Sequence, residues 1–224
     1  MSTPTLPIHQ PEAADARSLS DRAYFAIREL IVSLELPPGS IVNERDLMGR
    51  LGLGRTPVRE ALRTLARERL VEVYPRRGIF VSSVNVRDLA ALSEVRVELE
   101  GFAARLAAER RSEADAEECT ALLDELDRTA GEHDERTLID LDQRLHRFVY
   151  RCARNPFLER TLNEYYVLTL RIWFLALDRV ARLERAVREH RALLEAIRAG
   201  APDRAEKTMR RHVQGFEEAI RKVL

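Results

Sequence analysis

The stretch Leu51-Gly-Leu-Gly-Arg-Thr-Pro-Val-Arg-Glu-Ala-Leu62 decides how the N-terminal part of this chain folds. It predicts a tight turn at residues 52–54, followed by a short helix with two different faces. Arg55, Arg59 and Arg63 recur every four residues and share one face of that helix. The opposite face is apolar and would pack inward; it carries Val58, Ala61, Leu62 and Leu65. A helix of this kind can present guanidinium groups to the base edges or phosphates of DNA.

The alternative is that the three arginines form a solvated surface, which is the usual arrangement of charged residues at helical spacing. The distribution of charge favours DNA. Residues 17–83 hold 12 arginines against 8 acidic residues, a net charge of +4, whereas residues 84–224 hold 25 basic against 27 acidic residues, a net charge of −2. The basic excess therefore lies in the part of the chain that would meet phosphates.

The flanking segments supply a scaffold for this helix. Residues 21–34 have apolar residues at helical spacing and end at Leu36-Pro-Pro-Gly39, and residues 44–51 predict a second short helix. Residues 70–81 contain two β-rich runs around a basic tip, Arg76-Arg77-Gly78, which predicts a hairpin. Helix, helix, turn, helix and basic hairpin together predict a winged helix-turn-helix with a small β-hairpin wing.

The same segment resembles the GntR-type bacterial transcription regulators. The residues that carry the resemblance run from Pro38 to Val81: Pro38-Gly39, Asn43-Glu-Arg-Asp-Leu47, Leu51-Gly52, Arg55-Thr-Pro-Val-Arg-Glu-Ala-Leu62, Leu65 and Arg76-Arg-Gly78. The resemblance implies DNA contacts from Arg45, Arg55, Thr56, Arg59 and Gly78. Gly54 departs from the pattern, since the family commonly has Ser or Thr there, so a helix cap is lost.

Length and composition predict two domains. With 224 residues and 45% hydrophobic content, the chain can hold a DNA-binding domain at 17–83 and a second domain at 84–224. Residues 1–16 contain three prolines and no basic residue, which predicts a disordered tail and not a secretory signal. The most apolar stretch, Val167 to Leu177, is interrupted by Arg171 and is too short to span a membrane. The two cysteines lack metal-ligand spacing, so we expect a protein of the reducing cytoplasm.

The second domain is expected to be helical throughout. Amphipathic segments near residues 87–110, 113–130, 136–153, 157–178, 180–199 and 202–223 predict an antiparallel bundle of about six helices. The fold class is therefore mainly α, with the hairpin wing as its β structure.

Four residues of this bundle suit a metal. Asp142 and His146 lie four apart and share a helix face, while His190 and His212 lie on the inward stripes of two later helices. A single buried histidine is more often a hydrogen-bonded core residue than a ligand. Three histidines with a carboxylate favour a divalent transition metal, zinc first and nickel or manganese as alternatives, with coordination positions open to water or a ligand.

This half of the chain resembles the FCD effector domain of the fatty-acid-regulator subgroup of GntR proteins. The residues that carry this resemblance are Asp142-Gln-Arg-Leu-His146, Asn155-Pro156, Glu189-His190 and Met209-Arg-Arg-His212. Leu145 replaces a commoner aromatic residue. The resemblance implies metal binding by the four residues and a small carboxylate effector that completes the coordination of the metal.

Two arginines are candidate anchors for that effector. The resemblance places Arg96 as a carboxylate-binding residue, which could grip the anion with its guanidinium fork; the alternative is a surface ion pair with Glu100. Arg171 is flanked by apolar residues, so it could be a charge in the pocket or could extend its head group to water.

These observations leave two classes of function open. The first is a ligand-responsive transcription regulator that binds operator DNA as a homodimer. Within this class, the regulator could also sense the metal itself, without an organic effector. The second is a metal-dependent hydrolase fused to a DNA-binding domain, since a bound metal can activate water. The absence of an additional general base at useful spacing counts against catalysis, so we expect no enzyme.

Overall fold

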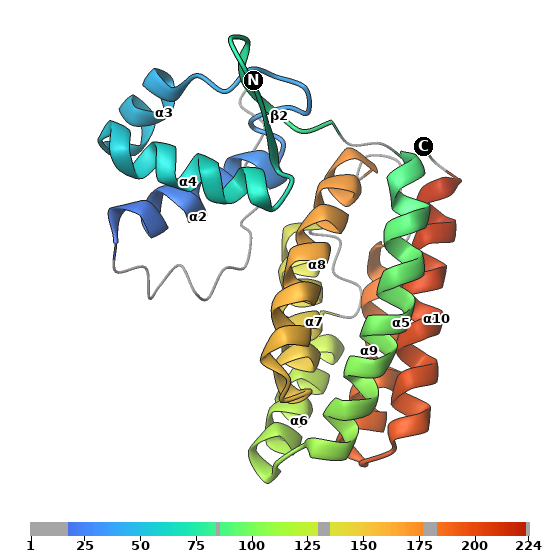
Figure 1. Cartoon of the computed structure of the whole chain (residues 1–224). Coiled ribbons are helices and arrows are strands. Elements are labelled where there is room, and N and C mark those ends of the chain that lie inside the picture. Colours follow the sequence, from blue (N-terminus) through green and yellow to red (C-terminus); the bar gives the residue numbers. More distant parts are fainter. Residues whose placement is uncertain (1–17, 84–85, 130–134, 177–182, 223–224) are drawn as a thin grey trace. The chain divides into compact units, whose positions relative to one another are not determined.

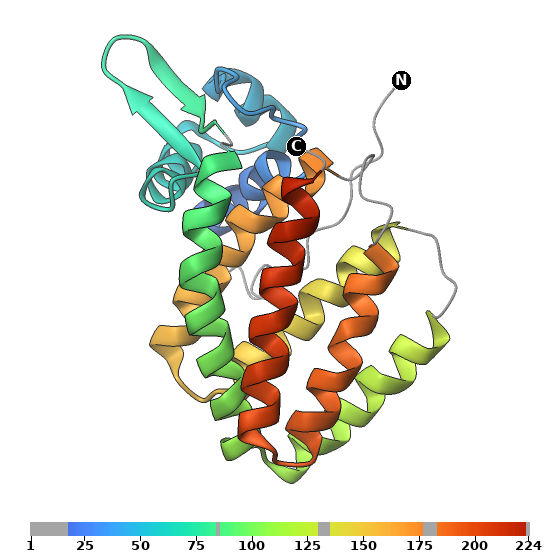
Figure 2. The ribbon, with the colours of Figure 1, turned by 90° about the vertical axis from the view of Figure 1, so that its right-hand side faces the viewer.

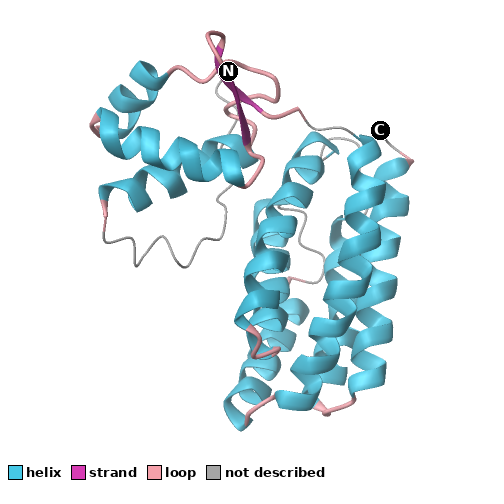
Figure 3. Cartoon of the chain, viewed as in Figure 1, coloured by secondary structure: helices cyan, strands magenta, loops and turns pink. Residues whose placement is uncertain are grey.

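The computed structural model describes residues 18–83, 86–129, 135–176 and 183–222 (Figure 1). The chain divides into two compact units. Unit 1 is Met1–Asn85 with Leu170–Leu175, and unit 2 is Val86–Thr169 with Ala176–Leu224. The tail predicted at residues 1–16 lies outside the described residues. The described part is mainly helical (Figure 3) and has one two-stranded sheet, so the predicted fold class is confirmed.

Unit 1 begins with the helices α2 (Leu19–Val32), α3 (Glu44–Leu51) and α4 (Arg55–Arg67). Local signals set their ends. Ser18 caps α2 in a capping box with Asp21, and the side chain of Asn43 accepts hydrogen bonds from two backbone N–H groups at the start of α3. Helix α3 ends at Gly52, whose φ of 63° lies in the left-handed region. This residue makes the sharp turn that leads into α4.

The core of unit 1 forms where α2 packs against α4. The apolar face predicted for α4 is buried: Val58, Ala61, Leu62 and Leu65 are all at most 2% exposed. Ala23, Ile27 and Ile31 of α2 are fully buried in the same core. Burying an aliphatic side chain of this size stabilises a fold by roughly 1.5–3 kcal/mol, so this packing determines the orientation of α4.

The predicted hairpin is formed by β1 (Val71–Tyr74) and β2 (Gly78–Val81), paired antiparallel from Val71–Val81 to Tyr74–Gly78. Its turn uses two left-handed residues, Arg76 with φ 64° and Gly78 with φ 107°. The hairpin is tied to the rest of unit 1 by an isolated bridge between Ile41 and Phe80. The predicted winged helix-turn-helix is therefore present.

Unit 2 contains α5 (Val86–Arg110), α6 (Glu113–Arg128), α7 (Glu135–Cys152), α9 (Leu183–Arg198), α10 (Pro202–Arg221) and most of α8 (Pro156–Ala176). The described part of this unit has no strand, and each predicted helical segment is a helix. Helices α5 and α10 run side by side in both views (Figures 1 and 2) and share the most extensive helix contact. Gly101 of α5 lies at this contact, against the side chain of Arg210.

Among the described residues, no helix combines the length and the apolar character that crossing a membrane requires.

Candidate metal centre and nucleic-acid interface

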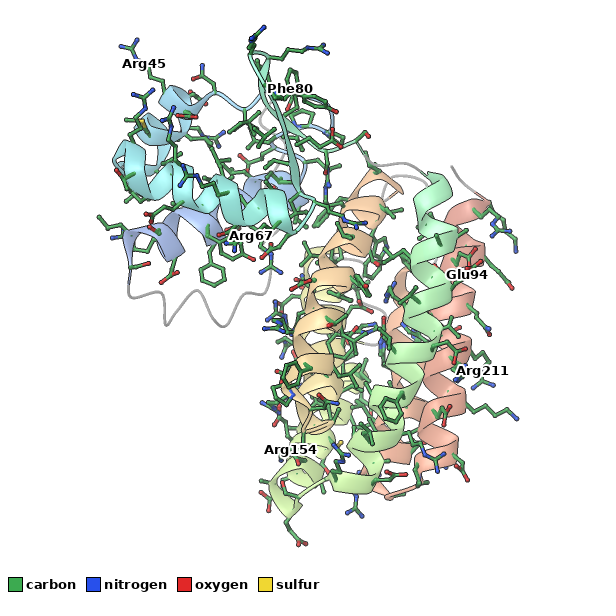
Figure 4. The ribbon with its side chains drawn as sticks, viewed as in Figure 1. Arg45, Arg67, Phe80, Glu94, Arg154 and Arg211 are labelled. Carbon is green, nitrogen blue, oxygen red and sulfur yellow. The ribbon has the colours of Figure 1, made fainter. Side chains whose placement is uncertain are left out.

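The residues predicted to contact DNA all lie on the solvent-exposed surface of unit 1. Arg45 is exposed in the first turn of α3, and its side chain extends outward from the helix (Figure 4). Arg55, Thr56 and Arg59 are exposed on α4, and Gly78 is exposed where the wing turn meets β2. The structure thus brings the helix residues and the wing together in one compact unit, with the guanidinium groups accessible.

Glu44 is part of this surface and was not predicted from the sequence. Its carboxylate accepts a hydrogen bond from Nε of Arg59 at 2.8 Å and lies 3.8 Å from Nε of Arg55. A carboxylate on α3 therefore binds one arginine of α4 and lies near a second. An acidic residue in the first turn of a helix can be recognised in the sequence. Its two arginine partners lie more than ten residues further along the chain, and only the packing of α3 on α4 brings them close.

The start of α4 confirms the consequence expected from Gly54. Gly54 is the N-cap residue, with extended backbone, and makes no side-chain capping hydrogen bond. The first N–H groups of α4 therefore remain available to another acceptor.

The four candidate metal ligands meet in the interior of unit 2. Asp142 and His146 come from α7, His190 from α9 and His212 from α10. One donor atom from each lies within 4.8 Å of all the others, and each residue is at most 6% exposed. Spacing along one helix brings the first two together, whereas only the packing of α7, α9 and α10 adds the other two.

The contacts within this cluster orient its donors. Nε2 of His146 lies 3.9 Å from one oxygen of Asp142, and Nδ1 of His190 lies 3.8 Å from the other. The rings of His190 and His212 are 4.2 Å apart between centroids. Tyr166, on α8, donates a hydrogen bond of 2.5 Å to Asp142. The carboxylate is thus held in place while it faces two imidazoles.

This donor set fits a divalent transition metal. Three imidazoles and one carboxylate are the ligand types that zinc and similar ions prefer. Burying a carboxylate among neutral imidazoles is costly unless a positive charge compensates it. A cation among them would remove that cost, which makes the cluster a candidate metal centre.

Arg96 forms the ion pair with Glu100 that the sequence offered as an alternative, but the pair is buried and not on the surface. Nε of Arg96 donates to Glu100 at 2.6 Å, and Nη1 donates to Thr169 at 2.9 Å. Arg96 is 3% exposed. Neither of these two hydrogen bonds uses Nη2.

Glu100 links this arginine to the metal cluster. It is fully buried, and its second oxygen lies 2.9 Å from Nδ1 of His146. Burial raises the pKa of Glu100, but the positive charge of Arg96, together with the interaction with His146, outweighs this effect and lowers the pKa to about 2. A signal for this position was present in the sequence, because Glu100 falls on the helical stripe of buried residues that includes Ser93 and Ala107.

Arg171 belongs to the segment Leu170–Leu175, which groups with unit 1. Its Nη1 donates to Oγ of Ser82 at 2.7 Å, and its Nη2 donates to the carbonyl of the same residue at 2.6 Å. The side chain is only 2% exposed, so of the two alternatives that the sequence left open, the one in which the head group reaches water does not hold. Burial lowers the pKa of Arg171 to about 10.

A winged helix-turn-helix joined to a helical domain with a buried histidine and aspartate cluster defines a class of protein, the two-domain transcription regulators of bacteria. Comparison with protein families agrees with this class. Residues 19–81 match the model described as "Bacterial regulatory proteins, gntR family", and residues 91–215, more than half of the chain, match the FCD domain. The chain belongs to the GntR family and carries an FCD domain.

Individual relatives support the same assignment. The chain is 33% identical to a probable D-xylose utilization operon transcriptional repressor of Paenarthrobacter nicotinovorans, covering 81% of this chain and 79% of that protein. It is 29% identical to the galactonate operon transcriptional repressor of Escherichia coli, covering 84% and 90%. Among solved structures, McbR/YncC of E. coli has the same fold, with a TM-score of 0.80 at 23% identity, covering 92% of this chain and 98% of that one.

The protein is therefore a DNA-binding transcription regulator. The family and its relatives are regulators and not enzymes, which rules against the fused hydrolase considered from the sequence.

Proposed function

We propose that this protein is a ligand-responsive repressor whose FCD domain holds a divalent transition metal, zinc in preference to nickel or manganese. The observation that carries the proposal is the buried cluster of Asp142, His146, His190 and His212, with donor atoms within 4.8 Å. When bound, the metal supplies positive charge and coordination positions open to an anion. Repression is the activity named for the relatives from P. nicotinovorans and E. coli.

The effector in this proposal is a small carboxylate. Arg96 is its anchor, because the nitrogen Nη2 is not used by Glu100 or Thr169 and a guanidinium edge binds a carboxylate through charge-assisted hydrogen bonds. One relative is named for a galactonate operon, and galactonate is itself a hydroxycarboxylate. Arg171 is not included in this site, because both of its η nitrogens bind Ser82.

We propose residues 17–83 as the operator-binding domain and residues 84–224 as the effector domain, a division that the matches at 19–81 and 91–215 support. Arg45, Arg55, Thr56, Arg59 and Gly78 form the DNA contact surface. The protein acts as a homodimer on two half-sites of an operator. An operator-binding protein works where the chromosome lies, so the proposed location is the cytoplasm.

The first test is a thermal-shift screen of metal-loaded and chelator-stripped protein against small mono-, di- and hydroxycarboxylates. We expect metal to raise the melting temperature and one class of acid to raise it further only when metal is present. The variant Arg96→Lys keeps the positive charge but loses the planar fork, and we expect it to lose the response to the acid while it keeps the response to metal.

The same acid should change operator affinity in a DNA-binding titration. A hundredfold change corresponds to about 2.7 kcal/mol of coupling between the two sites. An unchanged operator affinity at saturating acid would contradict the effector proposal. Stabilisation by metal with no response to any acid would instead identify a metal sensor, and the absence of any response to metal would contradict the metal site.

A further inference from the structure

Glu100 occupies an unusual position in unit 2. It is completely buried on α5, and its carboxylate lies between Arg96 and His146. Oε1 accepts the 2.6 Å hydrogen bond from Arg96, and Oε2 lies 2.9 Å from Nδ1 of His146. Burying a carboxylate destabilises the folded state unless its partners compensate the lost hydration. Here the partners are the candidate effector anchor, Arg96, and a candidate metal ligand, His146.

The position of Glu100 determines which nitrogen of His146 can reach a metal. Nδ1 faces Oε2 of Glu100 and lies 3.1 Å from the hydroxyl of Tyr150. Nε2 is on the opposite side of the ring and faces Asp142 at 3.9 Å. An imidazole that donates its Nδ1–H to a carboxylate keeps the lone pair of Nε2 free for a metal.

The contact between Glu100 and His146 is close but not aligned. Oε2 of Glu100 accepts no hydrogen bond of good geometry from the described residues, although Nδ1 of His146 is only 2.9 Å away. The 2.9 Å contact nevertheless places Glu100 on the Nδ1 side of the ring, which favours the arrangement in which Nε2 serves as the ligand.

His212 provides an internal comparison. Its Nδ1 lies 3.6 Å from a carboxylate oxygen of Glu189, a longer distance, and the Glu189 side chain is 40% exposed. Solvent weakens such a contact. The two carboxylates beside candidate ligands thus differ in burial and in distance, and Glu189 serves as a matched control for Glu100.

We propose that Glu100 is a positioning residue of the metal centre, which holds His146 with Nδ1 protonated and Nε2 directed at the metal. This inference rests on the metal site proposed above. Glu100 touches no metal in this arrangement and acts only through His146. Its bond to Arg96 fixes the carboxylate, so the arginine contributes to the geometry of the site from a distance.

The test measures Co²⁺ binding to chelator-stripped full-length protein, by competition with a chromophoric chelator. We expect Glu100→Gln to weaken Co²⁺ binding by roughly 10- to 100-fold. It should also shift the visible absorption bands of bound Co²⁺, which report ligand geometry. Glu189→Gln should change the affinity far less and leave the bands in place.

Two further variants separate positioning from folding. Glu100→Gln leaves Arg96 buried without a counter-charge, so the double variant Arg96→Met/Glu100→Gln, which removes both charges, should fold and show the same loss of Co²⁺ affinity. When His146→Ala has already removed the ligand, adding Glu100→Gln should cost nothing more, because the two residues act as one unit.

The protonation of His146 gives a readout that does not involve metal. Nitrogen chemical shifts of the metal-free protein should show Nδ1 protonated, and this preference should be lost in Glu100→Gln. If the wild-type protein binds Co²⁺ and Glu100→Gln binds it with equal affinity and identical absorption bands, Glu100 has no positioning role, although the metal site remains. Wild-type protein that binds no Co²⁺ would overturn both.

Discussion

Glu44 of α3 and Arg59 of α4 form a hydrogen-bonded ion pair on the proposed DNA surface, with Nε of Arg59 2.8 Å from the carboxylate. The side chains of Arg59 and Glu44 are 49% and 26% exposed, so the pair contributes little to the free energy of unfolding. Its effect is to hold the guanidinium in one orientation. The same carboxylate lies 3.8 Å from Arg55, so one acidic residue stands beside two candidate readers of DNA.

Glu44→Gln should therefore weaken specific operator binding without a change in the melting temperature. Nonspecific DNA binding should stay the same or increase, because a negative charge is removed from the surface. Fluorescence anisotropy with operator and scrambled duplexes at matched salt measures both effects. The control is Glu35→Gln, which breaks a pair of similar exposure, Glu35 with Arg50 at 2.8 Å, away from the proposed contacts. Equal effects of the two variants would argue against orientation by Glu44.

Arg59→Ala should reduce specific binding by about 1–3 kcal/mol if the guanidinium reads a base in a bidentate manner. The affinity for scrambled DNA should fall much less, because base readout contributes only to the specific complex. Arg67→Ala, near the C-terminal end of the same helix, controls for the loss of one positive charge. Unchanged operator affinity at matched salt would place Arg59 in the solvated surface that the sequence left as an alternative.

Gly101→Ala should destabilise the bundle by about 1–3 kcal/mol, because a methyl group at this position forces the packed side chain of Arg210 to shift. A Cβ at this position would lie 2.8 Å from Cγ of Arg210. Truncation of that side chain, in Gly101→Ala/Arg210→Ala, should relieve the clash. Gly215→Ala in α10 meets nothing within 4 Å and should stabilise the protein by about 0.5–1 kcal/mol. Urea denaturation measures all three, and equal stabilities of Gly101→Ala and Gly215→Ala would contradict close packing at Gly101.

Cys119 and Cys152 should resist thiol reagents in the native protein. Both are fully buried, and burial, followed by nearby acidic groups, raises the pKa of each thiol from 9.0 to about 12. The thiolate is the reactive form. Ellman's reagent should therefore label the native protein far more slowly than the urea-unfolded protein, whereas fast labelling at neutral pH would contradict burial.

The same shifts predict how stability depends on pH. The folded state keeps the thiol protons to higher pH than the unfolded state does. The stabilising contribution is therefore complete below about pH 9 and is lost as pH rises towards 12. The double variant Cys119→Ala/Cys152→Ala should lack this part of the alkaline decline in melting temperature.

The order of the secondary structure, and its limits to within about three residues, could be predicted from local patterns. Helix α4 begins at Arg55, after the glycine turn, and the hairpin forms around Arg76-Arg77-Gly78 as expected. Apolar periodicity, caps and turn residues are properties of a few neighbouring residues, and they act before any tertiary contact exists. The family patterns at residues 38–81 and 142–212 are equally local, so the assignment to the GntR family follows from the sequence.

Only the tertiary structure decided which side chains meet across helices. The sequence paired Asp142 with His146 along one helix turn, but it did not pair Glu100 with His146 or Glu44 with Arg59, which come from different helices. It also left Arg171 between a pocket and the surface, whereas the fold buries it against Ser82. Periodicity shows which face of a helix turns inward but not which residue of another helix lies opposite, because that depends on how whole helices pack.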